Sequence, residues 1–320
     1  MMDRARSVPL NMKTKPLLFL LIQLAALLGW STAFAITFSP VKVAPDVYAF
    51  IGETGPRTYE NEGMNANAGF IVTAQGVVVV DSGSSYRVAK AMHEAIRQVT
   101  KQPVKYVINT GGQDHRWLGN GYFKGLGAEI IASGKAREDM AERSALQLDA
   151  LRPVLREKLA GTQAVYPSRL VDRKEVLNLA GEEIHVLYFG GGHTPGDGVV
   201  WLPKSRILFS GDLIYVDRLL GIFPFSNTRN WLASFVAIEK LNPASIVPGH
   251  GRVCDLAKAR KETKDYLIML RGEMKKAVDK GVDLQAAVDA TDQSAYQYLE
   301  NYEALKGGNA NRTYLEMELE

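Results

Sequence analysis

The sequence has one cysteine among its 320 residues, and it has no excess of either charge once its first 35 residues are set aside. Cys254 has no partner for an internal disulfide and is better explained as a packed thiol than as a ligand. Residues 1–35 hold four of the 38 basic and one of the 35 acidic residues, so the remainder has 34 of each and a formal net charge of zero. This balance gives no indication of a nucleic-acid partner.

A long membrane-spanning run is also missing. Lys13 and Lys15 precede an apolar stretch from Leu17 to Leu28, which is short for a membrane span, and Ala33-Phe34-Ala35 follows it. This pattern predicts a secretory signal peptide over residues 1–35, and the alternative is an uncleaved anchor. We therefore expect a periplasmic or secreted protein with no stable membrane span after cleavage.

Strand-like and helix-like segments alternate along the rest of the chain. Short apolar runs predict strands at residues 47–51, 68–72, 76–80, 104–109, 175–179 and 183–189. Helical spacing predicts helices at residues 87–99, 258–278 and 284–290, and a charge-rich helical insertion at residues 134–162. Residues 309–316 are expected to form a polar turn followed by a helix or an extended tail.

Three potential metal ligands follow short apolar runs in the second half of the chain. They are His193, Asp212 and His250, and the runs before them are residues 184–189, 207–210 and 244–247. Side chains at the ends of neighbouring strands meet at one edge of a sheet, and these residue types bind divalent cations. The sequence therefore predicts a metal site at this edge.

Four segments resemble the metallo-β-lactamase fold superfamily, nearest to its SoxH-like and quinoprotein-relay metallohydrolases. They are Asn67–Val72, Gly76–Gly83, Gly192–Asp197 and Asn311–Glu316. The resemblance implies an α/β fold, a four-layer αββα sandwich, with a C-terminal helical extension. It divides the chain into a signal peptide (1–35), a metallo-β-lactamase-like domain (36–255) and the extension (256–320), which packs on that domain.

Members of this superfamily usually carry His-x-His-x-Asp-His after a strand, and that motif is rewritten here. Without a gap, Gly111 and Gln113 replace the two histidines, His115 replaces the aspartate, and Arg116 replaces the last histidine. With a shift of one residue, Asp114 and His115 supply the Asp-His pair. We favour the shifted register because it leaves one metal subsite complete next to His250.

The resemblance then implies a set of site residues. The expected metal ligands are Asp114, His115, His193, Asp212 and His250, which suit one ion better than two; zinc is expected, and iron is possible. Asp114 and Arg116 are candidate catalytic residues, although Arg116 has an alternative role as the structural partner of an acid. Asp81 is expected to orient a ligating histidine, and Gln113 is at most a weak ligand. His93 and His185 are interpreted as ordinary histidines.

Taken together, these features favour a secreted metal-dependent hydrolase. Its substrate would be a small molecule with an ester, thioester or amide bond. One alternative is a non-catalytic binding protein of the same fold in sulfur or quinoprotein metabolism. Another is a mononuclear iron enzyme that oxidises thiols. The rewritten motif leaves these alternatives open.

Overall fold

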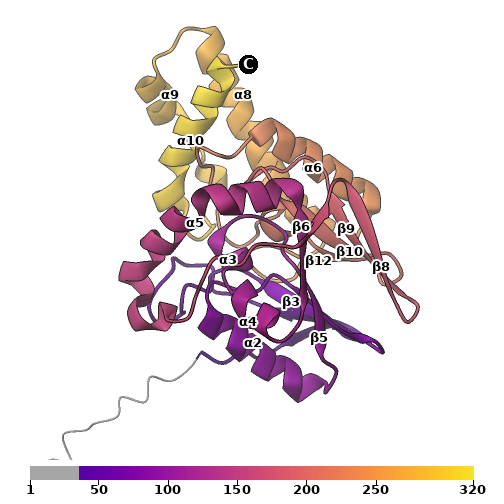
Figure 1. Ribbon diagram of the computed structural model, residues 1–320. Coiled ribbons are helices and arrows are strands. Elements are labelled where there is room, and N and C mark those ends of the chain that lie inside the picture. Colours follow the sequence, from indigo (N-terminus) through magenta and orange to yellow (C-terminus); the bar gives the residue numbers. More distant parts are fainter. Residues whose placement is uncertain (1–35) are drawn as a thin grey trace, which may run out of the picture. The chain divides into compact units, whose positions relative to one another are not determined.

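Two mixed β-sheets lie face to face in the computed structural model (Figure 1). The structure describes residues 36–320, which form one compact unit. The predicted signal peptide, residues 1–35, lies outside the described residues. None of the helices in residues 36–320 has the length and hydrophobicity of a membrane span.

The first sheet has seven strands in chain order. They are β1 (Val41–Ala44), β2 (Val47–Phe50), β3 (Ala68–Thr73), β4 (Gly76–Val80), β5 (Val104–Ile108), β6 (Glu129–Ser133) and β7 (Arg169–Val171). Strands β1 to β4 pair antiparallel, whereas β4 to β7 pair parallel. Parallel neighbours need a crossover, and α2 (Tyr86–Val99), α4 (Asn120–Gly125) and α5 (Gly134–Leu155) lie in these connections.

The second sheet has five strands in the reverse order, from β12 to β8. They are β8 (Lys174–Leu179), β9 (Glu182–Tyr188), β10 (Gly198–Leu202), β11 (Ile207–Phe209) and β12 (Ser245–Val247). Strands β8 to β11 are antiparallel, and β11 pairs parallel with β12 across the helix α6 (Thr228–Leu241).

Buried side chains fill three interfaces between four layers. One cluster joins the two sheets and includes Val80, Ile108, Ile184 and Phe209. A second joins the outer face of the first sheet to α2 and α4, and a third joins the second sheet to α6 and the C-terminal helices. This arrangement confirms the predicted four-layer αββα sandwich with C-terminal helices.

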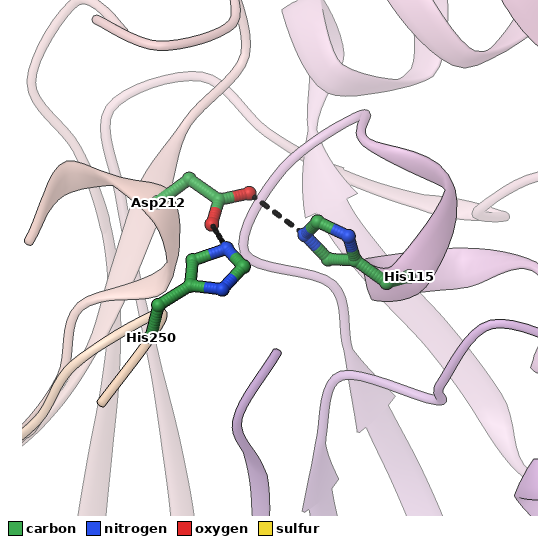
Figure 2. A group of neighbouring side chains, drawn as sticks. All are labelled: His115, Asp212 and His250. Atoms are coloured by element: carbon green, nitrogen blue, oxygen red, sulfur yellow. Dashed lines mark hydrogen bonds and ion pairs between the residues drawn. The ribbon is translucent and has the colours of Figure 1, made fainter. Parts of the chain in front are cut away.

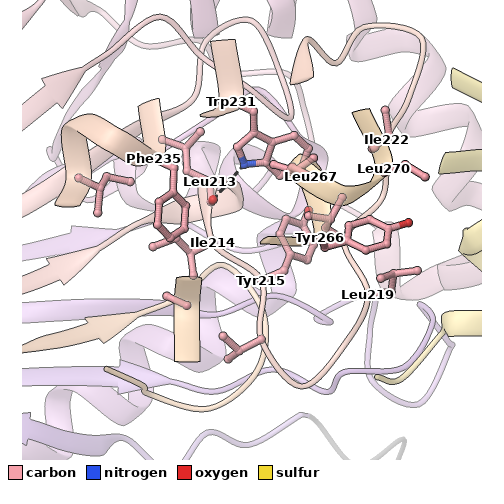
Figure 3. Close-up of a cluster of buried hydrophobic side chains, with 14 of the residues drawn as sticks. Leu213, Ile214, Tyr215, Leu219, Ile222, Trp231, Phe235, Tyr266, Leu267 and Leu270 are labelled. Atoms are coloured by element: carbon pink, nitrogen blue, oxygen red, sulfur yellow. Dashed lines mark hydrogen bonds between the residues drawn. The ribbon is translucent and has the colours of Figure 1, made fainter. Parts of the chain in front are cut away.

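The C-terminal helices share the core of the second sheet. They are α7 (Leu256–Ala259), a π-helical turn (Arg260–Lys264), α8 (Asp265–Asp279), α9 (Leu284–Ala290) and α10 (Tyr302–Glu318). Figure 3 shows Tyr266, Leu267 and Leu270 of α8 packed near Trp231 of α6 and Leu213. The predicted turn at residues 309–316 is wrong, because these residues lie inside α10.

Candidate metal centre

Three of the predicted ligands meet at one edge of the sandwich. His115 lies in α3 (Asp114–Trp117) after β5, Asp212 lies in the 3-10 turn η2 (Gly211–Leu213) after β11, and His250 follows β12. One ligand atom from each lies within 4.8 Å of the others, and the three residues are 1–3% exposed (Figure 2). We call these three residues the His–Asp–His group.

Asp212 is the centre of this group. Its Oδ2 lies 3.2 Å from Nε2 of His115, and its Oδ1 lies 3.1 Å from Nε2 of His250. Nitrogen and oxygen ligands about 2.0–2.1 Å from a tetrahedral zinc ion lie about 3.3 Å from one another. Each separation therefore fits a pair of ligands on one ion, and the two pairs use different oxygens of Asp212.

Arg116 binds the same carboxylate from the other side. Its Nε donates to Oδ2 of Asp212 at 3.1 Å, and its Nη2 donates to Oδ1 at 2.6 Å. The three remaining N–H groups donate to the carbonyls of Asn67 and Gly249 and to Oδ2 of Asp81. All five donors of the guanidinium thus have acceptors inside the protein, and binding an external anion would cost one of these bonds.

The charges around Asp212 keep it ionised. Burial raises the pKa of Asp212, but the Arg116 guanidinium and His115 outweigh this effect and hold the pKa well below its usual range. Asp81 accepts hydrogen bonds from the backbone N–H and the hydroxyl of Thr110 as well as from Arg116. Burial raises the pKa of Asp81 to about 6. The hydrogen bonds of Asp81 support Arg116 rather than a histidine.

The partners of His250 leave one of its nitrogens free for a cation. Nδ1 lies 2.6 Å from the carbonyl oxygen of Asn65, which only accepts, so Nδ1 carries the proton. Burial lowers the pKa of His250 to about 3, so the ring is neutral and Nε2 holds a lone pair. That lone pair faces a carboxylate oxygen of Asp212. Two acceptors 3.1 Å apart are suited to hold a metal ion.

Asp114 lies behind His115 rather than in the group. Its Oδ1 accepts from Nη2 of Arg57 at 2.6 Å and from the backbone N–H of His115 at 2.7 Å, and it lies 3.5 Å from Nδ1 of His115. Arg57 also lies 3.2 Å from that Nδ1. When His115 uses Nε2 as a ligand, its Nδ1 carries the proton, and Asp114 is the nearby acceptor.

His193 also lies outside the group. Its Nδ1 is 3.0 Å from the carbonyl oxygen of Gly221, and its Nε2 is 3.4 Å from the hydroxyl of Tyr215. The Tyr215 ring stacks on His250 with the centroids 4.5 Å apart, so Tyr215 contacts both histidines. Burial lowers the pKa of His193 to about 4. The ring packs among Phe223, Phe225 and Trp231.

The rewritten part of the motif is filled by two buried acids. A Cβ atom on Gly111 would lie 2.5 Å from Oδ1 of Asp197, and one on Gly112 would collide with Asp139. Gln113 is 3.4 Å from Nη1 of Arg143, which pairs with Asp139. In either register of the motif, one of the two histidine positions, Gly111 or Gly112, therefore has no room for a side chain. Within residues 36–320, only the His–Asp–His group brings three or more potential ligands together.

Several contact residues of the site carried no signal in the sequence. Asn65 acts through its backbone carbonyl, which every residue possesses. Arg57 lies in the irregular loop between β2 and β3, and Tyr215 follows η2 in an apolar stretch that reads as core. Each of them takes part in the site only through a contact with a residue distant in the sequence.

The other two histidines lie outside the site. His93 contacts Tyr122, and His185 contacts Glu183.

Comparisons with known proteins agree with this fold. Residues 61–250 match the family model described as the metallo-beta-lactamase superfamily. A metallo-beta-lactamase type 2 from Elizabethkingia meningoseptica is 28% identical over 213 residues, which is 65% of this chain and 77% of that protein. The named relatives are metallo-beta-lactamases, so they give no support to the narrower SoxH-like subgroup.

Two solved structures show the fold. A metallo-beta-lactamase from Pontibacter korlensis superposes with a TM-score of 0.60 at 22% identity, over 72% of this chain and 99% of that chain. The sec-alkylsulfatase Pisa1 from Pseudomonas sp. superposes with a TM-score of 0.68 at 17% identity, over 87% of this chain and 50% of that chain. The latter superposition covers more of this chain.

Proposed function

The chain belongs to the metallo-beta-lactamase superfamily, and from that membership and the His–Asp–His group we propose a metal-dependent hydrolase that works with one ion. His115, Asp212 and His250 would hold the ion, most suitably zinc. The bond cleaved would belong to an ester, a thioester or an amide. The named relatives are beta-lactamases, whose substrates contain a cyclic amide.

The protein residues around the ion have separate tasks in this proposal. A metal ion bound there would polarise a carbonyl group and activate a water molecule. Arg116 fixes the carboxylate of Asp212 in one orientation, and the carbonyl of Asn65 fixes the ring of His250. Oδ1 of Asp114 lies 3.5 Å from Nδ1 of His115 and would orient the His115 ring. Burial of the group strengthens each of these electrostatic interactions.

The observation that supports a metal most directly is the contact between His250 and Asp212. An unprotonated imidazole nitrogen and an ionised carboxylate oxygen repel one another at 3.1 Å. A proton or a metal ion between them removes that repulsion. Burial lowers the pKa of His250 to about 3, so Nε2 does not gain a proton near neutral pH. A metal ion is then the remaining way to remove the repulsion.

Metal analysis of the purified protein tests the proposal. We expect about one metal ion per chain after dialysis against zinc, and the same analysis identifies iron if iron is the native ion. His250→Ala should lose the metal, whereas His185→Ala, far from the group, should keep it. Two ions per chain would show that the proposed ligand count is too low.

A non-catalytic binding protein is the second candidate, and one observation favours it. Arg116 binds both oxygens of Asp212, and each oxygen also faces an imidazole. The His–Asp–His group is therefore closely packed even without a metal ion. A protein that takes up no metal and hydrolyses no chromogenic ester, thioester or β-lactam would support this candidate. Turnover that depends on added zinc would refute it.

We also propose that the protein is exported. The support is the basic residues Lys13 and Lys15, the apolar run after them and the motif Ala33-Phe34-Ala35. N-terminal sequencing of protein recovered outside the cytoplasm should give Ile36 as the first residue. A mature chain that still begins at Met1 or Met12 would contradict the proposal.

A further inference from the structure

A buried acid, Glu62, contacts the first residue that the structure describes. Oε1 of Glu62 accepts a hydrogen bond from the backbone N–H of Ile36 at 3.4 Å. Glu62 is fully buried, and its backbone lies in the left-handed region with a φ of 51°. A residue with a side chain adopts that region only at a cost, so the contacts around Glu62 must hold it there.

Ile36 is itself held on the fold. Ile36 and Phe38 pack against the cluster that joins the first sheet to α2 and α4. The ring of Phe38 meets that of Phe50 edge to face, with the centroids 5.3 Å apart. Phe50 is the last residue of β2. The backbone nitrogen of Ile36 therefore has a defined position beside Glu62.

Glu62 also binds two cations from neighbouring helices. Arg87 of α2 donates to it through Nε at 3.0 Å, and Nζ of Lys158 in the 3-10 turn η1 (Arg156–Leu159) lies 3.4 Å from Oε1. The same Nζ donates to the carbonyl of Tyr59 at 2.8 Å. These contacts fasten the turn at Glu62 to two other elements.

The surroundings of Ile36 favour a positive charge. A cavity of about 350 Å³ lies beside Ile36, and Glu53 and Glu60 line it. A cation at the nitrogen of Ile36 would thus lie near the carboxylates of Glu53, Glu60 and Glu62. Their attraction offsets the repulsion from the two cations that already contact Glu62.

The loop that contains Glu62 also contacts the His–Asp–His group. It connects β2 to β3, and within it Arg57 binds Asp114 while the carbonyl of Asn65 accepts from Nδ1 of His250. Arg57 and Asn65 both lie within five residues of Glu62 in the chain. Contacts that fix Glu62 therefore limit the motion of both residues.

We infer that cleavage of the Ala35–Ile36 peptide bond creates an α-ammonium group that pairs with Glu62 and fixes the loop 51–67. Hydrolysis by a peptidase consumes one water molecule, leaves a carboxylate on Ala35 and turns the amide nitrogen of Ile36 into an ammonium. The ammonium adds a charge–charge attraction and has three donors in place of one. The inference rests on the proposed export, which supplies the cleavage. Removal of the signal peptide thereby completes the support of the metal site.

Two metal-free forms of the purified protein test the inference. One begins at Ile36. The other begins at Ala35, which turns the nitrogen of Ile36 back into an amide and moves the ammonium about 3.8 Å along the chain. Each is released from an N-terminal fusion by a protease that leaves no additional residue. We expect the form that begins at Ile36 to have a Tm that is higher by about 2 °C or more.

Substitution of Glu62 identifies the partner of the ammonium. Glu62→Gln in both forms should remove the difference in Tm, because the ammonium then lacks its carboxylate. Glu94→Gln is the matched control, since Glu94 is an exposed acid on the same helix as Arg87, and it should leave the difference unchanged. Equal Tm values for the two forms without substitution would overturn the inference.

Limited proteolysis reports on the loop and needs no variant of Glu62. Trypsin cleaves after Arg57, and cleavage of a folded chain requires local opening. We expect cleavage after Arg57 to be about fivefold faster or more in the form that begins at Ala35. Cleavage after Arg252, an exposed arginine outside the loop, should have the same rate in both forms. Equal rates after Arg57 would refute the fixing of the loop.

The inference and the proposed function fail separately. Neither measurement uses a metal, so a protein that never takes up zinc refutes the hydrolase and leaves the ion pair standing. An exported chain that still begins at Met1 refutes the cleavage and the inference together. An exported chain that begins at Ile36, with equal Tm values for the two purified forms, refutes the inference alone.

Discussion

Asp212 is the residue on which the charges of the site converge. Its oxygens receive two hydrogen bonds from Arg116 and face the Nε2 atoms of His115 and His250. A carboxylate accepts about four hydrogen bonds, so every lone pair of Asp212 has a defined neighbour. The Nε2 atoms of His115 and His250 would hold a metal ion together with Asp212, and the two hydrogen bonds from Arg116 keep the Asp212 carboxylate in place.

The first prediction separates His115 from Asp114 as ligands. His115→Ala should lower zinc affinity by much more than 100-fold, because it removes one of three ligands. Asp114→Asn should lower it by about 10- to 100-fold, because Asp114 only orients His115. Competition with a zinc chelator measures both values. Equal losses would place Asp114 on the metal, as the shifted register of the sequence motif proposes, and His93→Ala should have no effect.

The second prediction concerns the loop that replaced the usual histidines. Gly111→Ala should lower the free energy of unfolding by about 1–3 kcal/mol, because its Cβ would lie 2.5 Å from Asp197. Gly125→Ala in α4 has open space around its Cβ, and it should leave stability unchanged or raise it by about 0.5–1 kcal/mol. Urea unfolding measures both.

A double substitution checks the cause. If the clash with Asp197 destabilises Gly111→Ala, then Asp197→Ala in the same chain should cancel part of the loss, giving a coupling energy of about 0.5 kcal/mol or more. Simple additivity of the two losses would show that the carboxylate of Asp197 is not what excludes a side chain at position 111.

At the scale of elements, the apolar runs and the charge-rich helix α5 were predictable, whereas the last polar segment was not. The run Gly76–Val80 is a strand with the predicted bounds, and α9 has the predicted bounds Leu284–Ala290. Residues 309–316 contain too many polar side chains to suggest a packed helix. Asn309 is nevertheless buried in α10, where it bonds the carbonyl of Leu220 and the N–H of Ile222.

The candidate metal site was also predictable only in part. Asp212 and His250 could be predicted, because each follows an apolar run that the sheet must bury. No pattern in the sequence indicates that Asp114 faces Arg57 or that His193 faces Tyr215. Both outcomes depend on loops with no periodic pattern, whose positions are set by contacts distant in the sequence.

The third prediction belongs to the contact between α10 and α6. Glu316 accepts hydrogen bonds from the backbone N–H groups of Thr228 and Arg229 at the start of α6. An acid at a helix N-terminus stabilises the helix, so Glu316→Gln should lower the free energy of unfolding by about 1 kcal/mol. Glu318→Gln, exposed on the same helix, is the control. Equal urea midpoints for the two variants would contradict this role of Glu316.

On the scale of the whole molecule, the C-terminal extension and the sandwich share one hydrophobic core. The cluster that contains Trp231 and Phe235 of α6 also contains Leu267 and Leu270 of α8 and Tyr314 of α10. The loop that carries Tyr215 and Arg218 lies between these two sets, so the extension supports one wall of the site. Residues 36–320 accordingly form one compact unit.

The last prediction is that a chain ending at residue 255 does not fold. Removing residues 256–320 would expose the side chains of α6 and of the loop 213–222 that now pack against α8 and α10 (Figure 3). Each large apolar side chain exposed in this way costs about 1.5–3 kcal/mol, and a few of them equal the whole stability of a typical domain. Circular dichroism and urea titration of residues 36–255 should show no cooperative transition, whereas residues 36–320 should show one. A soluble fragment 36–255 that unfolds cooperatively and still binds zinc would prove the extension to be a separate appendage.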